Sequence, residues 1–188
     1  MLTKELDTDI NASYSTSTNE KGIIVSVSKD FETISGYTAA ELKGQNHNIL
    51  RHPDMPKIIF KKMWHALENG DEFIGFIFNH AKDGGYYWLA NKTYLFSRDK
   101  KKGTCKYFSY KTTMSSRARF HMANLYSILL EEEKKGGIEA SEAHLDEYLK
   151  FRGVSFDEYM KTFLDGGGLF KTGFFMARKL FGGGAKDE

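Results

Sequence analysis

A loop between residues 44 and 56 carries the densest group of side chains that could bind a ligand. It contains Arg51, His52 and Asp54 and ends at Pro56, which suits the first turn of a helix. A guanidinium, an imidazole and backbone donors at a helix start are what an anionic ligand group requires. The alternative is a loop in which an Arg51–Asp54 pair only fixes the loop's own shape. The sequence leaves both interpretations open.

The other patterns argue against an enzyme and against a metal centre. The chain lacks a Gly-x-x-x-x-Gly-Lys-Ser/Thr phosphate loop, a dinucleotide fingerprint after a strand, a Gly-x-Ser-x-Gly turn and a His-Glu-x-x-His helix. The single cysteine, Cys105, excludes an internal disulfide and a zinc site of several thiolates. His47 and His52 have too few further ligands at defined spacing to hold a metal. We therefore expect a binding protein that is not an enzyme and holds no metal ion.

Composition narrows the class of partner. The 188 residues include 27 Lys and Arg against 25 Asp and Glu, a net charge of +2, with no concentrated basic face of the kind that binds nucleic acid. Aromatic residues make up 14% of the chain, which suits a pocket for a planar ligand or a partner surface. There is no apolar stretch of about 18 residues and no apolar signal region at the N-terminus, so we expect a cytoplasmic protein.

Periodicity and turn signals predict an α+β fold. A β-branched run over residues 23–28 predicts a strand, and Thr38 with Glu41 forms a capping-box pattern that starts a short helix. Apolar residues at helical spacing predict a helix over residues 56–68. Three antiparallel strands are expected over residues 73–80, 86–96 and 104–114, with a hairpin turn at residues 82–85. Residues 1–19, polar and without periodicity, are expected to be a tail or cap.

The last third of the chain is expected to be helical. Ala118, Met122, Leu125 and Leu129 lie on one helix face, Gly136-Gly137 interrupts the pattern, and further helices reach residue 164. The apolar stripes could pack on the sheet, dimerise or dock a partner. The segment Leu169–Phe181, between two triple glycines, suits a helix that docks on a membrane surface or partner, or that packs on the same chain. The expected organisation is a tail over 1–19, a central domain over 20–114 and a helical extension over 115–188.

Several motifs together closely resemble the PAS domain of the aerotaxis-receptor family, over roughly residues 20–114. They are Ile-Ser-Gly-Tyr at 34–37, Glu-Leu-x-Gly at 41–44, His-Asn-Ile-Leu-Arg-His-Pro-Asp-Met-Pro at 47–56, Phe-x-x-Met-Trp-x-x-Leu at 60–67 and Lys-Asp-Gly-Gly-Tyr-Tyr-Trp at 82–88. The resemblance implies a PAS fold, which is a five-stranded antiparallel sheet with flanking short helices, here followed by C-terminal helices. It also implies non-covalently bound FAD and a role in sensing redox state for energy taxis.

The resemblance also implies roles for individual residues. The FAD-retention positions of the family match Arg51, His52 and Asp54, and the residue thought to face the flavin ring edge matches Asn79. Family tryptophans at or near the pocket match Trp64 and Trp88, while Phe73 stands where the family often has Trp. Trp64 could instead be a core anchor on its helix, and pocket and core remain open for Trp88. We expect the aromatic contacts on the concave face of the sheet to come from Phe73, Phe76, Phe78, Trp88, Tyr107 or Tyr110.

The expected function is that of a cytoplasmic PAS protein that senses redox or oxygen status through FAD and signals to a membrane-bound chemotaxis receptor. A free-standing sensor of this kind resembles bipartite energy-taxis systems. Light-sensing adduct chemistry is not expected, because the loop at residues 46–50 has no cysteine. Two alternatives remain, a haem b gas sensor with His65 as axial ligand and a ligand-free module that dimerises. No nucleic-acid partner is expected.

Overall fold

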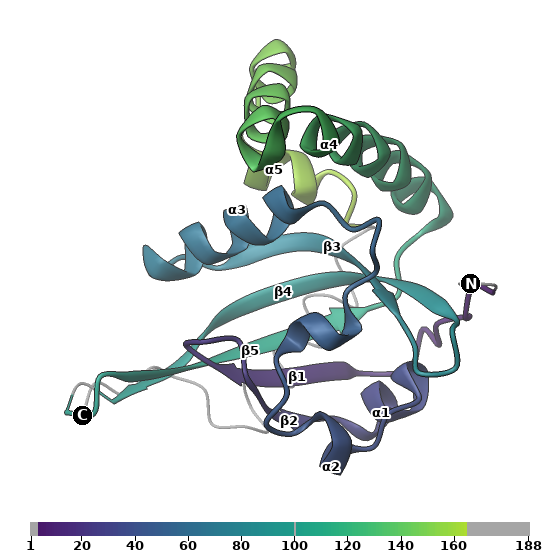
Figure 1. The fold of residues 1–188 in the computed structure, drawn as a ribbon, viewed down its shortest axis with the longest axis vertical. Coiled ribbons are helices and arrows are strands. Elements are labelled where there is room, and N and C mark those ends of the chain that lie inside the picture. Colours follow the sequence, from purple (N-terminus) through teal and green to yellow (C-terminus); the bar gives the residue numbers. More distant parts are fainter. Residues whose placement is uncertain (1–3, 100, 165–188) are drawn as a thin grey trace.

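The computed structural model describes residues 4–99 and 101–164, and its centre is one five-stranded antiparallel sheet (Figure 1). The strand order is β2-β1-β5-β4-β3. The strands are β1 (Tyr14–Asn19), β2 (Ile24–Val27), β3 (Phe73–His80), β4 (Tyr86–Asp99) and β5 (Thr104–Thr112). The expected α+β fold with a five-stranded antiparallel sheet is therefore confirmed.

Strand β1 corrects the prediction for residues 1–19. Instead of a tail, Tyr14–Asn19 pairs with β2 on one side and with β5 on the other. The strand escaped the sequence analysis because it reads Tyr-Ser-Thr-Ser-Thr-Asn, without the apolar alternation that marks a half-buried strand. Thr16 is nevertheless buried. The tertiary environment, rather than hydrophobicity, keeps this polar strand inside the sheet.

Four short elements between β2 and β3 cover one face of the sheet, which we call the inner face (Figure 1). Thr38 and Glu41 form the predicted capping box, and Gly70 with a φ of 84° follows the last of the four elements. The elements are α1 (Lys29–Ser35), α2 (Ala39–Leu42), the 3-10 helix η1 (His47–Leu50) and α3 (Lys57–Glu68).

The C-terminal helices lie at the β3 edge of the sheet, next to α3 (Figure 1). Helix α4 (Ser116–Arg152) is interrupted by non-helical backbone at Gly136 and Gly137, so the predicted break is confirmed. The predicted apolar face of its first half is buried. This half covers the opposite face of the sheet, the outer face, where the Tyr126 hydroxyl donates to the Phe76 carbonyl at 2.7 Å. The short helix α5 (Phe156–Lys161) follows, capped by Ser155.

Polar contacts from both halves of α4 connect it to α3. Lys62 pairs with Glu142 and Asp146 at 3.4 and 3.0 Å, and the N–H of Ile58 donates to a Glu133 carboxylate oxygen at 2.9 Å. One of the free N–H donors at the start of α3 is thus satisfied by a side chain of α4.

The predicted segment Leu169–Phe181 lies outside the described residues. Across residues 4–99 and 101–164, no helix combines the length and the apolar character that crossing a membrane requires.

Candidate functional site

A cavity of about 410 Å³ lies between the inner face of the sheet, the η1 loop and α3. Strands β3, β4 and β5 form its floor, while Arg51, Phe60 and Trp64 contribute to the opposite wall. A volume of this size falls within the range of small-molecule sites, and most of the lining surface is apolar with a few polar groups.

The floor of the cavity is a row of buried polar side chains. Asn91 donates to the hydroxyl of Thr93 at 3.0 Å, and this hydroxyl lies 2.9 Å from that of Ser109. Asn79 is 1% exposed and faces the same space. Polar groups buried to this extent are normally hydrogen-bonded, because losing water without a replacement partner costs about 1–3 kcal/mol.

Two of these floor amides have atoms that find no partner in the described part of the chain. They are Nδ2 of Asn79 and Oδ1 of Asn91, one donor and one acceptor, and both residues line the cavity. The buried hydroxyl of Tyr87 lies across the strand pair from Asn79; burial raises the pKa of Tyr87, and the interaction with the Asn79 side chain opposes this rise. A ligand edge that accepts at one place and donates at another would complete the hydrogen bonding of this floor.

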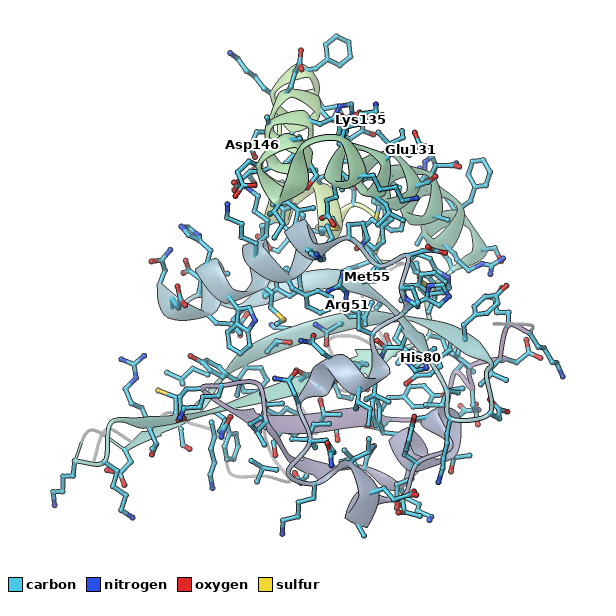
Figure 2. All side chains as sticks on the ribbon, in the orientation of Figure 1. Arg51, Met55, His80, Glu131, Lys135 and Asp146 are labelled. Carbon is cyan, nitrogen blue, oxygen red and sulfur yellow. The ribbon has the colours of Figure 1, made fainter. Side chains whose placement is uncertain are left out.

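Arg51 lies on the wall of the cavity and holds the shape of its loop. Its Nε and Nη2 atoms donate to the Met55 carbonyl at 3.2 and 2.7 Å, and its guanidinium lies over the Phe60 ring, 5.4 Å from the centroid. Figure 2 shows Arg51 and Met55 next to each other on the chain that leads from η1 to α3. The loop is thus fixed through a carbonyl and not through an Arg51–Asp54 pair. Because a guanidinium has five N–H donors, Arg51 retains donors beyond these two bonds.

The backbone of Arg51 also pairs with β3, forming an antiparallel bridge with Asn79. This bridge places the loop directly against the edge strand of the sheet. It brings Arg51 and Asn79, which are far apart in the sequence, to one side of the same cavity.

Trp64 lines the cavity from α3. Its ring stands edge-on to the Tyr107 ring, with centroids 5.8 Å apart. A Cβ on Gly22, which has a φ of 72°, would lie 3.3 Å from Trp64, so a glycine permits this close approach. Trp64 and Tyr107 give the cavity an aromatic wall, so of the two roles left open for Trp64 the structure places it at the cavity.

The sequence analysis assigned no role at a ligand cavity to two basic residues that line it, His47 and Lys111. Burial, and secondly the charge of Lys111, lowers the pKa of His47 to about 3. Burial lowers the pKa of Lys111 to about 7. The position of His47 in the polar loop was visible in the sequence, but no local signal indicated that Lys111 faces inward.

Three of the predicted ligand residues lie on the other side of the sheet. The His52 ring stacks on Phe78 with centroids 3.6 Å apart, and Phe78 stacks on Trp88 at 4.3 Å. The Trp88 ring lies against the Tyr126 ring of α4, with centroids 5.6 Å apart. Asp54 is exposed and lies beside His52. None of the predicted trio His52, Asp54 and Trp88 lines the inner cavity. The structure therefore does not bring them together with Arg51 and Asn79; they line a second, outer cavity of about 870 Å³ beside α4.

The alternation of side chains along a strand explains this arrangement. Asn79 faces inward, so its neighbour Phe78 faces outward, and Trp88 is paired with Phe78. The same rule puts Phe76 and Tyr110 on the outer face, contrary to the expectation that they lie on the concave face. Of the expected aromatic contacts from the sheet, Tyr107 is the one that lines the cavity.

Phe73, His65 and Cys105 are also absent from the cavity lining. The Phe73 ring occupies the space where a side chain on Gly75 would stand, and it stacks on Phe156 of α5 with centroids 6.0 Å apart. Phe73 is therefore a core residue. His65 is exposed on α3, so it cannot coordinate an iron held in this cavity.

Comparisons with known proteins agree with this fold. The sequence model of a family described as "PAS fold" matches residues 24–110. The aerotaxis receptor of Escherichia coli (strain K12) is 36% identical over 113 residues, which cover 60% of this chain and 22% of that receptor. Phototropin-2 of Oryza sativa subsp. japonica is 34% identical over 65 residues, covering 35% of this chain and 7% of the relative. The chain thus spans less than a quarter of the length of these relatives.

Solved structures support the fold alone. A light-oxygen-voltage domain studied with a flavin analogue superimposes with a TM-score of 0.51 at 23% identity, over 60% of this chain and 85% of that one. The strand order, the helices on the inner face and the family match agree with one another. Residues 24–110 therefore have the PAS fold, and the chain is similar in sequence to the aerotaxis receptor and to phototropin-2.

Proposed function

We propose that the cavity binds a flavin non-covalently, in the form of FAD, and that the protein reports redox or oxygen status to a signalling partner. The observation that carries the proposal is the pair of buried amides on the cavity floor, Asn79 and Asn91, with one donor and one acceptor unpaired. The similarity to a protein named aerotaxis receptor, and to a light-oxygen-voltage domain studied with a flavin analogue, supports the same ligand class.

The residues of the cavity fit this group by their chemistry. A flavin ring has apolar faces and a polar edge that both donates and accepts hydrogen bonds, and when bound it supplies reversible uptake of electrons and protons. Asn79 can donate to such an edge and Asn91 can accept from it. Trp64 and Tyr107 provide aromatic contact and keep water away. The remaining donors of Arg51 suit an anionic group such as a phosphate.

Strand β3 gives a physical path from the cavity to the C-terminal helices. Asn79 faces inward, and the adjacent Phe78 belongs to the outer stack that reaches Tyr126 of α4. If the hydrogen bonds of Asn79 rearrange with the redox state, β3 shifts and the contact with α4 changes. A difference of about 1.4 kcal/mol between two arrangements changes their ratio tenfold, which is enough for a signal.

The rest of the proposal follows the family resemblance. The protein acts in the cytoplasm without catalysing a reaction, and its partner is a membrane-bound chemotaxis receptor. A ligand-free dimerisation module would have no use for a cavity with unpaired buried amides. Because His65 is exposed on α3, its position argues against a haem with His65 as axial ligand.

An absorption spectrum of the purified full chain, with and without added FAD, tests the proposal. We expect flavin bands, and we expect Arg51→Ala to bind flavin about 10- to 100-fold more weakly, because a hydrogen bond to a charged group contributes about 1.5–3 kcal/mol. Arg119→Ala is the matched control, since Arg119 pairs with Glu5 and lines no part of this cavity. A colourless protein after supplementation, or a haem Soret band, would contradict the proposal.

A further inference from the structure

Lys111 is a buried lysine on the floor of the cavity. It lies on β5, it is 2% exposed, and it is paired in register with Asn91 of β4. The unpaired amide oxygen of Asn91 and the ammonium of Lys111 therefore belong to neighbouring strands on the same face of the sheet.

The surroundings of Lys111 provide little compensation for its charge. Nζ donates to the Thr16 hydroxyl at 2.8 Å and lies over the Phe31 ring, 5.3 Å from the centroid. His47, the nearby titratable group, is neutral near pH 7, because its pKa is lowered to about 3. Among the described residues, no carboxylate lies within ion-pair distance of Lys111.

A buried ammonium without a negatively charged partner destabilises the folded state. Removing a charge from water costs several kcal/mol unless a partner repays it, and the lowered pKa of Lys111 reflects this cost. A hydrogen bond to Thr16 could be made equally well by a neutral side chain. An ammonium has three N–H donors, and one of them is used by Thr16. A negative charge in the cavity would favour the protonated form of Lys111 and would use its remaining donors.

We propose that Lys111 selects the charge of the bound ligand, so that in the flavin-loaded protein it favours the reduced over the oxidised flavin. This inference rests on the proposed function. When a flavin takes up two electrons and one proton, its ring gains one negative charge. Lys111 attracts that charge across a poorly solvated floor, where the attraction is stronger than in water. Asn79 and Asn91 position the ring, while Lys111 sets how readily it is reduced.

The test is the midpoint potential of the bound flavin, measured by titrating the full chain with dithionite in the presence of redox indicator dyes. In Lys111→Met we expect the ratio of reduced to oxidised flavin at a given potential to fall at least tenfold, a decrease of about 30 mV for a two-electron couple. Lys111→Arg keeps the charge and should stay close to the wild-type potential. Lys106→Met removes the same charge from an exposed position on the same strand and serves as the matched control.

Lys111→Gln covers the case in which the methionine variant does not fold, because an amide can keep the hydrogen bond to Thr16. A folded, flavin-loaded neutral variant with an unchanged midpoint potential would overturn the inference, as would an equal decrease in Lys106→Met. A wild-type protein that takes up no flavin would instead contradict the proposed function, so the two failures are distinguishable.

Discussion

The two faces of the sheet carry different kinds of side chain. The inner face carries buried amides, hydroxyls and Lys111 around a cavity, and two of its amide atoms lack partners. The outer face carries the stacked rings of His52, Phe78 and Trp88, which pack on the first half of α4. The outer face combines this aromatic packing with a second cavity of about 870 Å³ that His52, Phe78 and Trp88 line, whereas the inner face retains unused hydrogen-bonding capacity and a buried lysine without a carboxylate partner.

The difference teaches that residues adjacent in the sequence can have opposite roles. Arg51 lines the cavity and His52 stacks outside it, and the same holds for Asn79 and Phe78. A cluster of polar and aromatic residues in the sequence is therefore divided between binding and packing. Substitution of a residue that lines the cavity should accordingly weaken ligand uptake, whereas substitution of a residue that packs on the outer face should lower stability.

The largest effect should come from Trp88→Ala. Removing a buried tryptophan from a packed core costs about 3–5 kcal/mol, and Trp88 is 7% exposed. Urea denaturation followed by circular dichroism measures the loss. Trp64→Ala is the matched comparison, because Trp64 is half-buried on the cavity wall and should lose less stability but more flavin affinity. The division between the faces fails if Trp88→Ala leaves stability unchanged and abolishes flavin binding.

Asn79→Leu should weaken flavin binding by about 5- to 150-fold, since a hydrogen-bonding group lost opposite a buried partner costs about 1–3 kcal/mol. The stability of the flavin-free protein should stay the same or rise, because the variant no longer buries an unpaired amide donor. A fluorescence titration with FAD gives the affinity. Asn124→Leu, at an exposed position of α4, is the control. A variant that is strongly destabilised and binds flavin normally would show that Asn79 belongs to the fold and not to the site.

The smallest effect concerns the pH dependence of stability through His47. Its pKa is about 3 in the folded protein against an ordinary value of 6.5, so between these values the unfolded chain holds a proton that the folded chain does not. Stability should therefore fall as the pH decreases from 6.5 toward 3, by at most about 1.4 kcal/mol per pH unit. His47→Gln should remove this part of the decline. Urea denaturation of both proteins at about pH 7.5 and about pH 5.5 gives the free energy of unfolding at each pH. Between these two pH values the wild type should lose about 1 kcal/mol more stability than His47→Gln. Parallel pH profiles of the two proteins would refute the assignment.

Local elements could be predicted because their signals lie within a few residues of each other. The capping box of Thr38 and Glu41, the helix that follows Pro56 and the break at Gly136-Gly137 all depend on backbone preferences and neighbouring side chains. The family motifs predicted the five-stranded sheet, and they led to three residues of the cavity, Arg51, Trp64 and Asn79.

The sequence by itself predicted the helices, the turns and four of the residues that line the cavity, which are Arg51, Trp64, Asn79 and Tyr107. The tertiary structure decided that the polar segment Tyr14–Asn19 is a strand, that Trp88 and His52 pack outside, and that Lys111 is buried without a carboxylate partner. The reason is that the face of a strand residue is set by its pairing partners and by the helices that cover each side. These partners lie tens of residues away, so no local pattern contains the information.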